Sequence, residues 1–315
     1  MPKPKKQRTE QSPFFYLNVV LRVFYSILLV GISFLVIGGA LGAGIGIGYF
    51  TYLVEDTKLP EKKQLQRDLG EMTQTSHLTY NDNSQIATIR SDLLRTNVSF
   101  DEISPLITTA IIATEDEHFY EHNGIVPKAV IRALASEVTG FGSSGGSTLT
   151  QQLVKQQILS NETTFSRKAN EILLATEVEN SFTKEEIITM YLNVSPFGRN
   201  NRGQNIAGVQ EAALGIFGVN ASEVNLPQAA FIAGLPQSPI VYSPYSNTGE
   251  IKEAEYLAYG LERKDFVLFS MYRNHDITKE EYEEALAYDL AADFIEPQAI
   301  EQKDQNFLYY AIMEE

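Results

Sequence analysis

Glu115 is the residue whose type and setting point most directly to acid–base chemistry. It lies four positions after Ile111 and four before Phe119, so in a helix its carboxylate falls in line with an apolar stripe. Partial burial there would make the carboxylate a better proton acceptor near neutral pH. We therefore predict that Glu115 is a general base and that its neighbour Asp116 points elsewhere and stays ionised. The alternative interpretation is an ordinary helix end exposed to solvent.

Two histidines beside this glutamate could suggest a metal site. His118 and His122 have the spacing of one helix face. In the zinc-protease helix a Glu directly follows the first His, whereas here Phe119 follows it. The sequence offers no obvious third ligand. We predict no dedicated metal site, and we expect His122 to help close the end of the helix.

A glycine-rich run leads into a helix at residues 145–155, GGSTLTQQLVK. The free backbone N–H groups and the dipole of a helix N-terminus attract anions, and Ser147 or Thr148 can cap the helix. One face would present a hydroxyl, two amides and an ammonium, from Thr148, Gln151, Gln152 and Lys155. The run lacks the Gly-Lys-Ser/Thr ending of a P-loop. It predicts a phosphate-binding face, the alternative being a linker before an ordinary polar helix.

Positive side chains gather shortly afterwards at Arg167 and Lys168, with Glu171 one helical turn further on. Beyond residue 54 the chain has 20 basic and 39 acidic residues, a formal charge of −19, which argues against a nucleic-acid-binding protein. Cations concentrated in such an acidic chain indicate a local anionic ligand. Together with Lys155 they are predicted to neutralise a diphosphate that Glu171 helps to organise. The alternative is a surface ion pair between Arg167 and Glu171.

The elements that must position these residues are mainly helical. An apolar stripe predicts a helix from residue 103 that stops near residues 122–124, where Asn and Gly favour a left-handed cap. Further helices are predicted at residues 127–138, from 147 or 148, at 165–179, at 183–192 with a Thr183–Glu186 capping box, at 227–234 and across 252–288. A short β hairpin is predicted at residues 78–90, and a glycine loop with an exposed Phe141 follows the 127–138 helix.

An uncharged run at residues 23–54 predicts a membrane anchor. It has about 32 residues, more than the roughly 20 needed to cross a bilayer, and ends in an aromatic belt. Basic residues precede it, which predicts a single-pass helix with a cytoplasmic N-terminus and an extracellular remainder. Gly38, Gly42 and Gly46 could let two such helices approach, although glycine is common in membrane helices. The predicted organisation is a cytoplasmic tail (1–22), the membrane helix (23–54), a stalk and hairpin (55–100), a core (101–246) and a helical C-terminal part (247–315).

Five segments, in order, resemble motifs of the family 51 glycosyltransferase domain of class A penicillin-binding proteins. The first two are residues 115–124, EDEHFYEHNG, and residues 145–155. The others are residues 167–179, RKANEILLATEVE, residues 184–193, KEEIITMYLN, and residues 229–239, AAFIAGLPQSP. The resemblance covers residues 78–244, and residues 199–204 are similar to the Gram-positive form. Full-length members continue into a penicillin-binding transpeptidase domain, so the chain resembles a member truncated before that domain, with residues 247–315 including the start of the linker.

The resemblance implies a lysozyme-like helical glycosyltransferase domain with a small membrane-proximal jaw, and Phe141 with its loop would lie near that jaw. It implies a peptidoglycan glycosyltransferase that polymerises lipid II into β-1,4-linked glycan by inverting displacement of polyprenyl diphosphate, with Glu115 as base and Glu171 as a second catalytic residue. Substrate-binding roles carry over to Asp116, Phe119, Ser147, Thr148, Gln151, Gln152, Lys155, Arg167, Lys168 and Asn193. The implied partners are lipid II, the growing glycan strand, the cell membrane, and cell-wall synthesis and division proteins. No dedicated cofactor is implied, although some members depend on a divalent cation such as Mg²⁺ or Mn²⁺.

Two rival interpretations remain open. A lysozyme-like glycan hydrolase would also be helical and use a Glu acid, but it would not need a diphosphate-binding cation cluster. A non-catalytic membrane scaffold would not depend on Glu115. Assays with lipid II distinguish a transferase from a hydrolase, because a ladder of longer glycans indicates transfer and shortening of preformed glycan indicates hydrolysis.

Overall fold

The structure, a computed structural model, describes residues 13–70, 77–79, 85–88, 93–128, 146–159 and 164–298. Contacts divide the chain into two compact units, Met1–Thr57 and Lys58–Glu315. Each unit is described by itself. Most of the predicted helix at 127–138 lies outside the described residues. The glycine loop with Phe141, which is expected near the implied jaw, also lies outside them.

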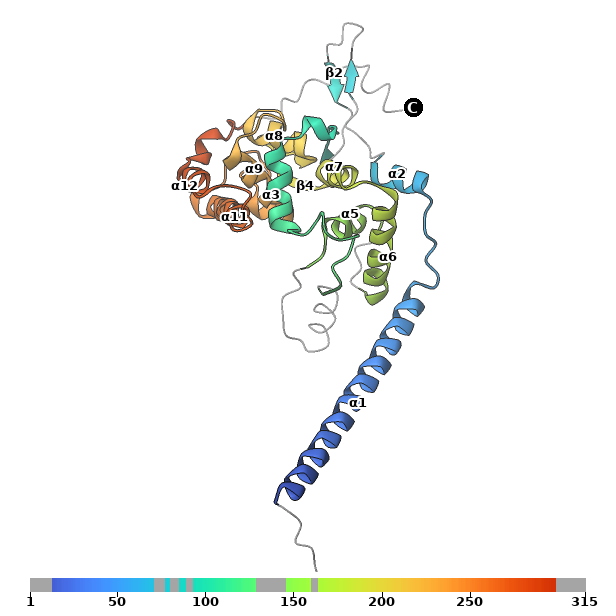
Figure 1. Ribbon diagram of the computed structural model, residues 1–315. Coiled ribbons are helices and arrows are strands. Elements are labelled where there is room, and N and C mark those ends of the chain that lie inside the picture. The colour runs from blue at the N-terminus through green and yellow to red at the C-terminus, as the bar shows by residue number, and fades with distance from the viewer. Residues whose placement is uncertain are drawn as a thin grey trace, which may run out of the picture. The chain divides into compact units, whose positions relative to one another are not determined.

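The first unit contains one long helix, α1 (Pro13–Val54), drawn in blue in Figure 1. It begins well before the predicted residue 23 and includes Arg22. Within it, Phe14–Val54 is long and apolar enough to cross a membrane, by length and composition. The hydroxyls of Ser26 and Ser33 donate to carbonyl oxygens one turn earlier, which satisfies them inside an apolar helix. This helix is therefore a candidate membrane span.

The second unit is mainly helical in its described part, which confirms the predicted fold class. Its α-helices are α2 (Lys62–Gly70), α3 (Pro105–Glu115), α5 (Leu149–Gln157), α6 (Phe165–Ser181), α7 (Lys184–Val194), α8 (Val209–Phe217), α9 (Leu226–Gly234), α10 (Pro239–Tyr242), α11 (Ala254–Arg273) and α12 (Lys279–Ala287). Short 3₁₀ turns lie at Phe100–Glu102, Leu235–Gln237 and Leu290–Asp293. The starts of α5, α6 and α9 match the sequence prediction closely, and α7 opens with the predicted capping box.

Two small sheets accompany the helices. Strands β1 (His77–Thr79) and β2 (Gln85–Thr88) pair antiparallel, which confirms the predicted hairpin. The second sheet has the order β3-β5-β4, in which β5 (Asn205–Ala207) pairs parallel with β3 (Leu93–Leu94) and antiparallel with β4 (Pro196–Arg199). The sequence did not predict this sheet, because strands of two to four residues are too short to show an alternating pattern.

The core around the candidate site is formed by α3, α9 and α11, which pack against one another. Helix α9 is buried on all sides from Ala229 to Gly234, and α3 contributes the fully buried Ile107 and Ile111. Gly234 allows close packing, because a Cβ there would lie 2.8 Å from Cγ of Arg263 on α11. The close approach of α9 and α11 at this point brings the Arg263 side chain of α11 to the C-terminal end of α3.

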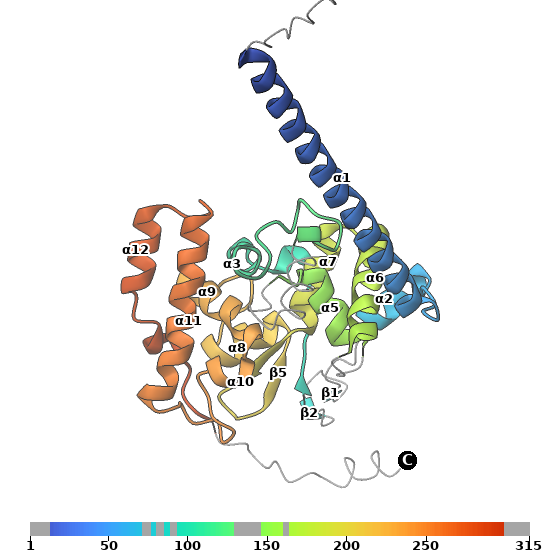
Figure 2. The ribbon, with the colours of Figure 1, turned by 90° about the horizontal axis from the view of Figure 1, so that it is seen from below.

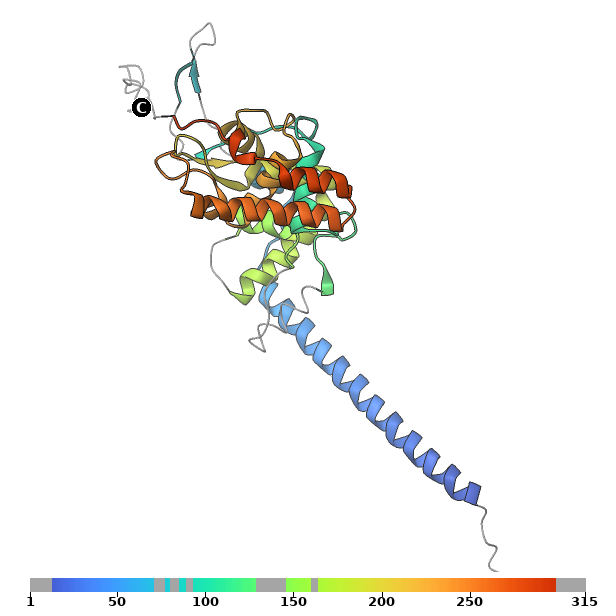
Figure 3. The same ribbon diagram turned by 90° about the vertical axis from the view of Figure 1, so that its left-hand side faces the viewer.

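Two predicted segments differ from the structure. Within the predicted stalk, α2 carries Leu65 and Leu69 one turn apart, and both are fully buried in the core beside α5. The predicted helical region 252–288 is broken between α11 and α12, where His275 adopts a left-handed φ of 66°. Figure 3 shows α11 and α12 side by side, and the rings of Tyr272 and Tyr282 stack between them with centroids 5.1 Å apart.

Candidate active site

Glu115 is the last residue of α3, a helix that starts after the N-cap Ser104 with Pro105 at its first position. The prediction that this helix runs on to residues 122–124 is wrong. Asp116 leaves the helical conformation with φ −159° and ψ 72°, and turns follow it. Glu115 is therefore placed by a helix end, and its predicted alignment with Phe119 on one helical stripe does not occur. The same break removes the helical spacing that related His118 to His122.

The Glu115 carboxylate is held from two other helices. Arg263 of α11 donates to its Oε1 at 3.0 Å, and Gln152 of α5 donates to its Oε2 at 3.1 Å. Tyr191 of α7 donates its hydroxyl to the Gln152 side-chain oxygen at 3.2 Å. The side chains of Glu115 and Arg263 are 14% and 11% exposed, so the pair is shielded while the carboxylate keeps some access to solvent. Figure 2 shows α3 between α11 and α5, the arrangement that these contacts require.

Tyr191 is a neutral donor in this network. Burial raises the pKa of its phenol, and the negative charge of Glu115 raises it further. The hydroxyl therefore keeps its proton at physiological pH and fixes the orientation of the Gln152 amide. The amide oxygen accepts from Tyr191, so the amide nitrogen faces Glu115.

Asp116 connects the end of α3 to the start of α5. It accepts the backbone N–H of Leu149 at 2.9 Å and lies 2.9 and 3.1 Å from Nε2 of His122. Because the Gly124 N–H donates to Nδ1 of His122 at 3.1 Å, Nε2 carries the proton and donates to Asp116. These competing bonds explain why the helix stops at Glu115. Asp116 thus supports the geometry, and its predicted part in substrate binding stays a prediction.

Several residues of the first and fourth motifs are held by the protein itself. Phe119 is fully buried, with the Lys184 ammonium 4.4 Å from its ring centroid. Asn193 exchanges two hydrogen bonds with the backbone of Val98, at 2.8 and 3.0 Å. His118 is half exposed and faces Glu121. Among the described residues, no group of three potential metal ligands comes together.

The start of α5 divides the predicted phosphate-binding face. Thr148 is the N-cap, and it forms a reciprocal capping box with Gln151, in which both side chains are buried. The Thr148 hydroxyl donates to the Gly124 carbonyl at 2.6 Å. Gln152 instead reaches Glu115, while Lys155 is exposed. Thr148 and Gln151 are thus engaged in building the helix start, and a contact of either with a phosphate stays a prediction.

A second buried carboxylate, Glu171 of α6, holds the predicted cations. Lys168 donates to its Oε1, and Arg167 donates to its Oε2 at 3.3 Å. The Glu171 side chain is 2% exposed, whereas those of Arg167 and Lys168 are 16% and 36% exposed. Lys168 also donates to the Ser147 hydroxyl at 3.0 Å. Arg167 and Glu171 do pair, as in the alternative interpretation, but Glu171 is buried rather than on the surface, and the cluster touches the residue that precedes the α5 cap.

Helix α5 and the residue before its cap therefore lie between the Glu115 carboxylate and the Glu171 cluster. Ser147 contacts the Glu171 cluster through Lys168, and Gln152 contacts Glu115. The arrangement offers a fixed proton acceptor at one end and positive charge at the other. The predicted convergence of Lys155 with the other cations remains a prediction. Sequence reasoning assigned no role to Arg263 or Tyr191, because Arg263 lies on a highly charged helix far along the chain.

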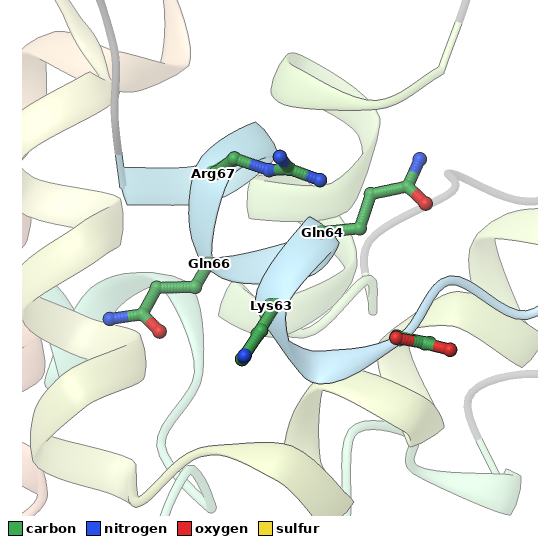
Figure 4. A pocket seen from close by; sticks show the side chains of 5 residues that line it. Lys63, Gln64, Gln66 and Arg67 are labelled. Atoms are coloured by element: carbon green, nitrogen blue, oxygen red, sulfur yellow. The ribbon is translucent and has the colours of Figure 1, made fainter.

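A surface hollow along α2 lies apart from this network in the chain. It is lined by Glu61, Lys63, Gln64, Gln66 and Arg67, and Figure 4 shows the side chains spread around one helix. The described lining contains no candidate catalytic or binding residue. A hollow formed by neighbouring polar side chains of one helix provides no enclosed site.

Comparison with known proteins places the chain in a family. A family model described as Transglycosylase matches residues 82–271. Penicillin-binding protein 1A/1B of Bacillus subtilis is 35% identical over 258 residues, which cover 78% of this chain and 27% of that protein. Penicillin-binding protein 2a of Streptococcus pneumoniae serotype 2 is 35% identical over 252 residues, covering 80% of this chain and 31% of that protein. The crystal structure of penicillin-binding protein 1A from Haemophilus influenzae aligns with 72% of this chain and 22% of that chain, with 20% identity and a TM-score of 0.40.

The chain belongs to the transglycosylase family, which confirms the resemblance drawn from the five motifs. It spans 27% and 31% of the lengths of the two curated relatives. The matched region extends through Arg263, so the arginine that contacts Glu115 lies inside the family domain.

Proposed function

We propose that this chain is a peptidoglycan glycosyltransferase that polymerises lipid II into β-1,4-linked glycan strands. Family membership and relatives named penicillin-binding proteins support this proposal. The observation that carries it is the Glu115 carboxylate, held by Arg263 and Gln152 and still partly accessible. A hydrolase would have no need of a cation cluster, whereas the cluster at Glu171 suits a diphosphate leaving group.

In the proposed reaction Glu115 acts as general base. Its carboxylate accepts the proton of the acceptor sugar's 4-hydroxyl, whose oxygen forms a bond to the anomeric carbon of the donor. The bond from that carbon to the diphosphate oxygen breaks, and its electron pair leaves with the polyprenyl diphosphate. Attack from the opposite face converts the α-linked donor into a β-linked product, so the displacement inverts the configuration.

Positive side chains would stabilise the charge that develops on the diphosphate. Lys155, Arg167 and Lys168 are proposed for this role, with Glu171 holding the last two in place. Ser147, Thr148, Gln151 and Gln152 would position the substrate directly or through the start of α5. No dedicated cofactor is proposed. Any Mg²⁺ or Mn²⁺ would accompany the diphosphate, and polymerisation measured with and without EDTA tests that requirement.

The candidate membrane helix supports a location beside the lipid-linked substrate. We propose that α1 anchors the chain in the cell membrane with a cytoplasmic N-terminus and an extracellular catalytic unit. Protease treatment of intact cells tests this orientation, because it should digest the second unit and spare residues 1–12. Lipid II, the growing strand and cell-wall synthesis and division proteins are the proposed partners.

Glu115→Gln tests the function directly. Loss of the general base should slow polymerisation of purified lipid II by at least about 10²-fold, while the nearly isosteric amide keeps the fold. Glu117→Gln is the matched control, since Glu117 lies two residues away, is 48% exposed and pairs with Arg273. Unchanged glycan ladders from Glu115→Gln would remove the proposed base, and shortening of preformed glycan by the parent chain would favour a hydrolase.

A further inference from the structure

Arg263 has a buried environment that is unusual for an arginine on a charged helix. Its side chain is 11% exposed, although α11 also carries the exposed residues Tyr259 and Phe266. A cation removed from water in this way costs free energy unless it is paired and hydrogen-bonded. Arg263 is paired with Glu115, a residue 148 positions away along the chain.

The guanidinium is positioned by more than its ion pair. Its Nε donates to the Gly234 carbonyl at 3.4 Å, and its central carbon lies 5.0 Å from the Phe266 ring centroid. The missing side chain of Gly234 leaves room for the Arg263 stem. Contacts on three sides limit the rotamers available to this long side chain, so its terminal nitrogen is directed at Glu115 before any substrate binds.

The two oxygens of Glu115 are restrained but not saturated. Oε1 accepts from Arg263 and Oε2 accepts from Gln152, and each carboxylate oxygen can accept a second hydrogen bond. The 14% exposure of the side chain leaves a path for an incoming hydroxyl. The carboxylate can therefore receive a proton without giving up the contacts that orient it.

The side chains that hold or orient the contacts of Glu115 come from three helices. Arg263 of α11 supplies positive charge, whereas Gln152 of α5 is uncharged and Tyr191 of α7 stays neutral. Within the described residues, Arg263 is therefore the cation that contacts Glu115. Its terminal nitrogen lies 3.0 Å from Oε1 of Glu115, and this charge-assisted contact fixes the position of that oxygen.

We propose that Arg263 is a positioning residue of the transfer reaction, which keeps the Glu115 carboxylate aimed at the acceptor hydroxyl. This inference rests on the proposed function. Arg263 acts through Glu115 and does not touch the diphosphate. It should therefore affect the rate of the chemical step more than the binding of lipid II.

The test uses the full chain in detergent with purified lipid II. Arg263→Gln should lower kcat by about 10²-fold, because the carboxylate loses its fixed geometry, and should change KM by less than about threefold. Arg263→Lys should restore only part of kcat, since lysine lacks the second donor group that bonds the Gly234 carbonyl.

Arg273→Gln is the matched control. Arg273 lies on the same helix and bridges to Glu117 at 3.0 Å, with both side chains about half exposed, so its loss should leave kcat and KM unchanged. Normal kcat in Arg263→Gln, or a loss confined to KM, would overturn the inference. If Arg263→Gln does not fold, Arg263→Lys decides, because an undiminished kcat would contradict a geometric role. An inactive Glu115→Gln beside a fully active Arg263→Gln would refute only this inference, whereas an active Glu115→Gln would refute the proposed base itself.

Discussion

The two glutamates of the candidate site, Glu115 and Glu171, obtain their partners in opposite ways. Glu171 receives Arg167 and Lys168 from its own helix, four and three residues earlier. Glu115 receives Gln152 and Arg263 from other helices, 37 and 148 residues further along the chain. The first cluster can form once α6 forms, whereas the second requires α3, α5 and α11 to be packed together. The Glu115 geometry thus depends on the assembled domain, and the Glu171 geometry depends mainly on one helix.

Removing the local carboxylate should have the largest effect on stability. Glu171→Ala leaves Arg167 and Lys168 without their buried counter-charge and should lower the free energy of unfolding by about 3 kcal/mol. Urea unfolding followed by circular dichroism measures this loss. Glu177→Ala on the same helix is the control and should change stability by about 0.5 kcal/mol. Equal stability of the two variants would mean that the Glu171 cluster does not hold α6.

A substitution at the packing contact between α9 and α11 should disturb the Glu115 site without removing any of its polar side chains. Gly234→Ala places a Cβ 2.8 Å from Arg263 Cγ, so the arginine must move, and polymerisation should fall roughly 10²-fold. Combining it with Arg263→Gln should add little, because both changes act on one interaction. Full additivity of the two losses would show that Gly234 acts elsewhere. Thermal melting of each variant separates this effect from unfolding.

Loss of the outer hydrogen bond should have a smaller effect. Tyr191→Phe removes the hydroxyl that orients Gln152 and should reduce kcat about tenfold, the equivalent of one hydrogen bond. The ring still fills its buried site, so stability should change by about 1 kcal/mol. Steady-state assays with lipid II measure the effect. A Tyr191→Phe variant as slow as Glu115→Gln would indicate a more direct role for the phenol.

The exposed pair of Glu117 and Arg273 should have the smaller coupling energy and serves as the reference for the Glu115–Arg263 pair. A double-mutant cycle on this pair should give a coupling energy below about 1 kcal/mol, because water and salt screen both groups. The same cycle on Glu115 and Arg263 should give a coupling at least twice as large. Similar couplings for the two pairs would mean that burial adds nothing to the Glu115 contact.

The same difference explains what the sequence could predict. Short-range features could be inferred from the sequence, because the Thr183–Glu186 capping box and the Arg167–Glu171 pair depend on spacing within one helix. The end of α3 could not be predicted, since it depends on Asp116 accepting the backbone N–H of Leu149, which comes from a distant helix. The family motifs identified Glu115 as the base candidate, but no local pattern joined it to an arginine 148 residues away.

The position of α11 matters for the design of shortened proteins. A chain ending at residue 246 would retain all five motif segments and the Glu171 cluster, yet it would lack the helix that starts at Ala254. Its Glu115 would keep the amide of Gln152 and lose its salt-bridge partner. Fragments prepared for enzymology or inhibitor screening should therefore continue through Arg273. A poorly active shorter fragment would reflect the missing helix rather than an absent second domain.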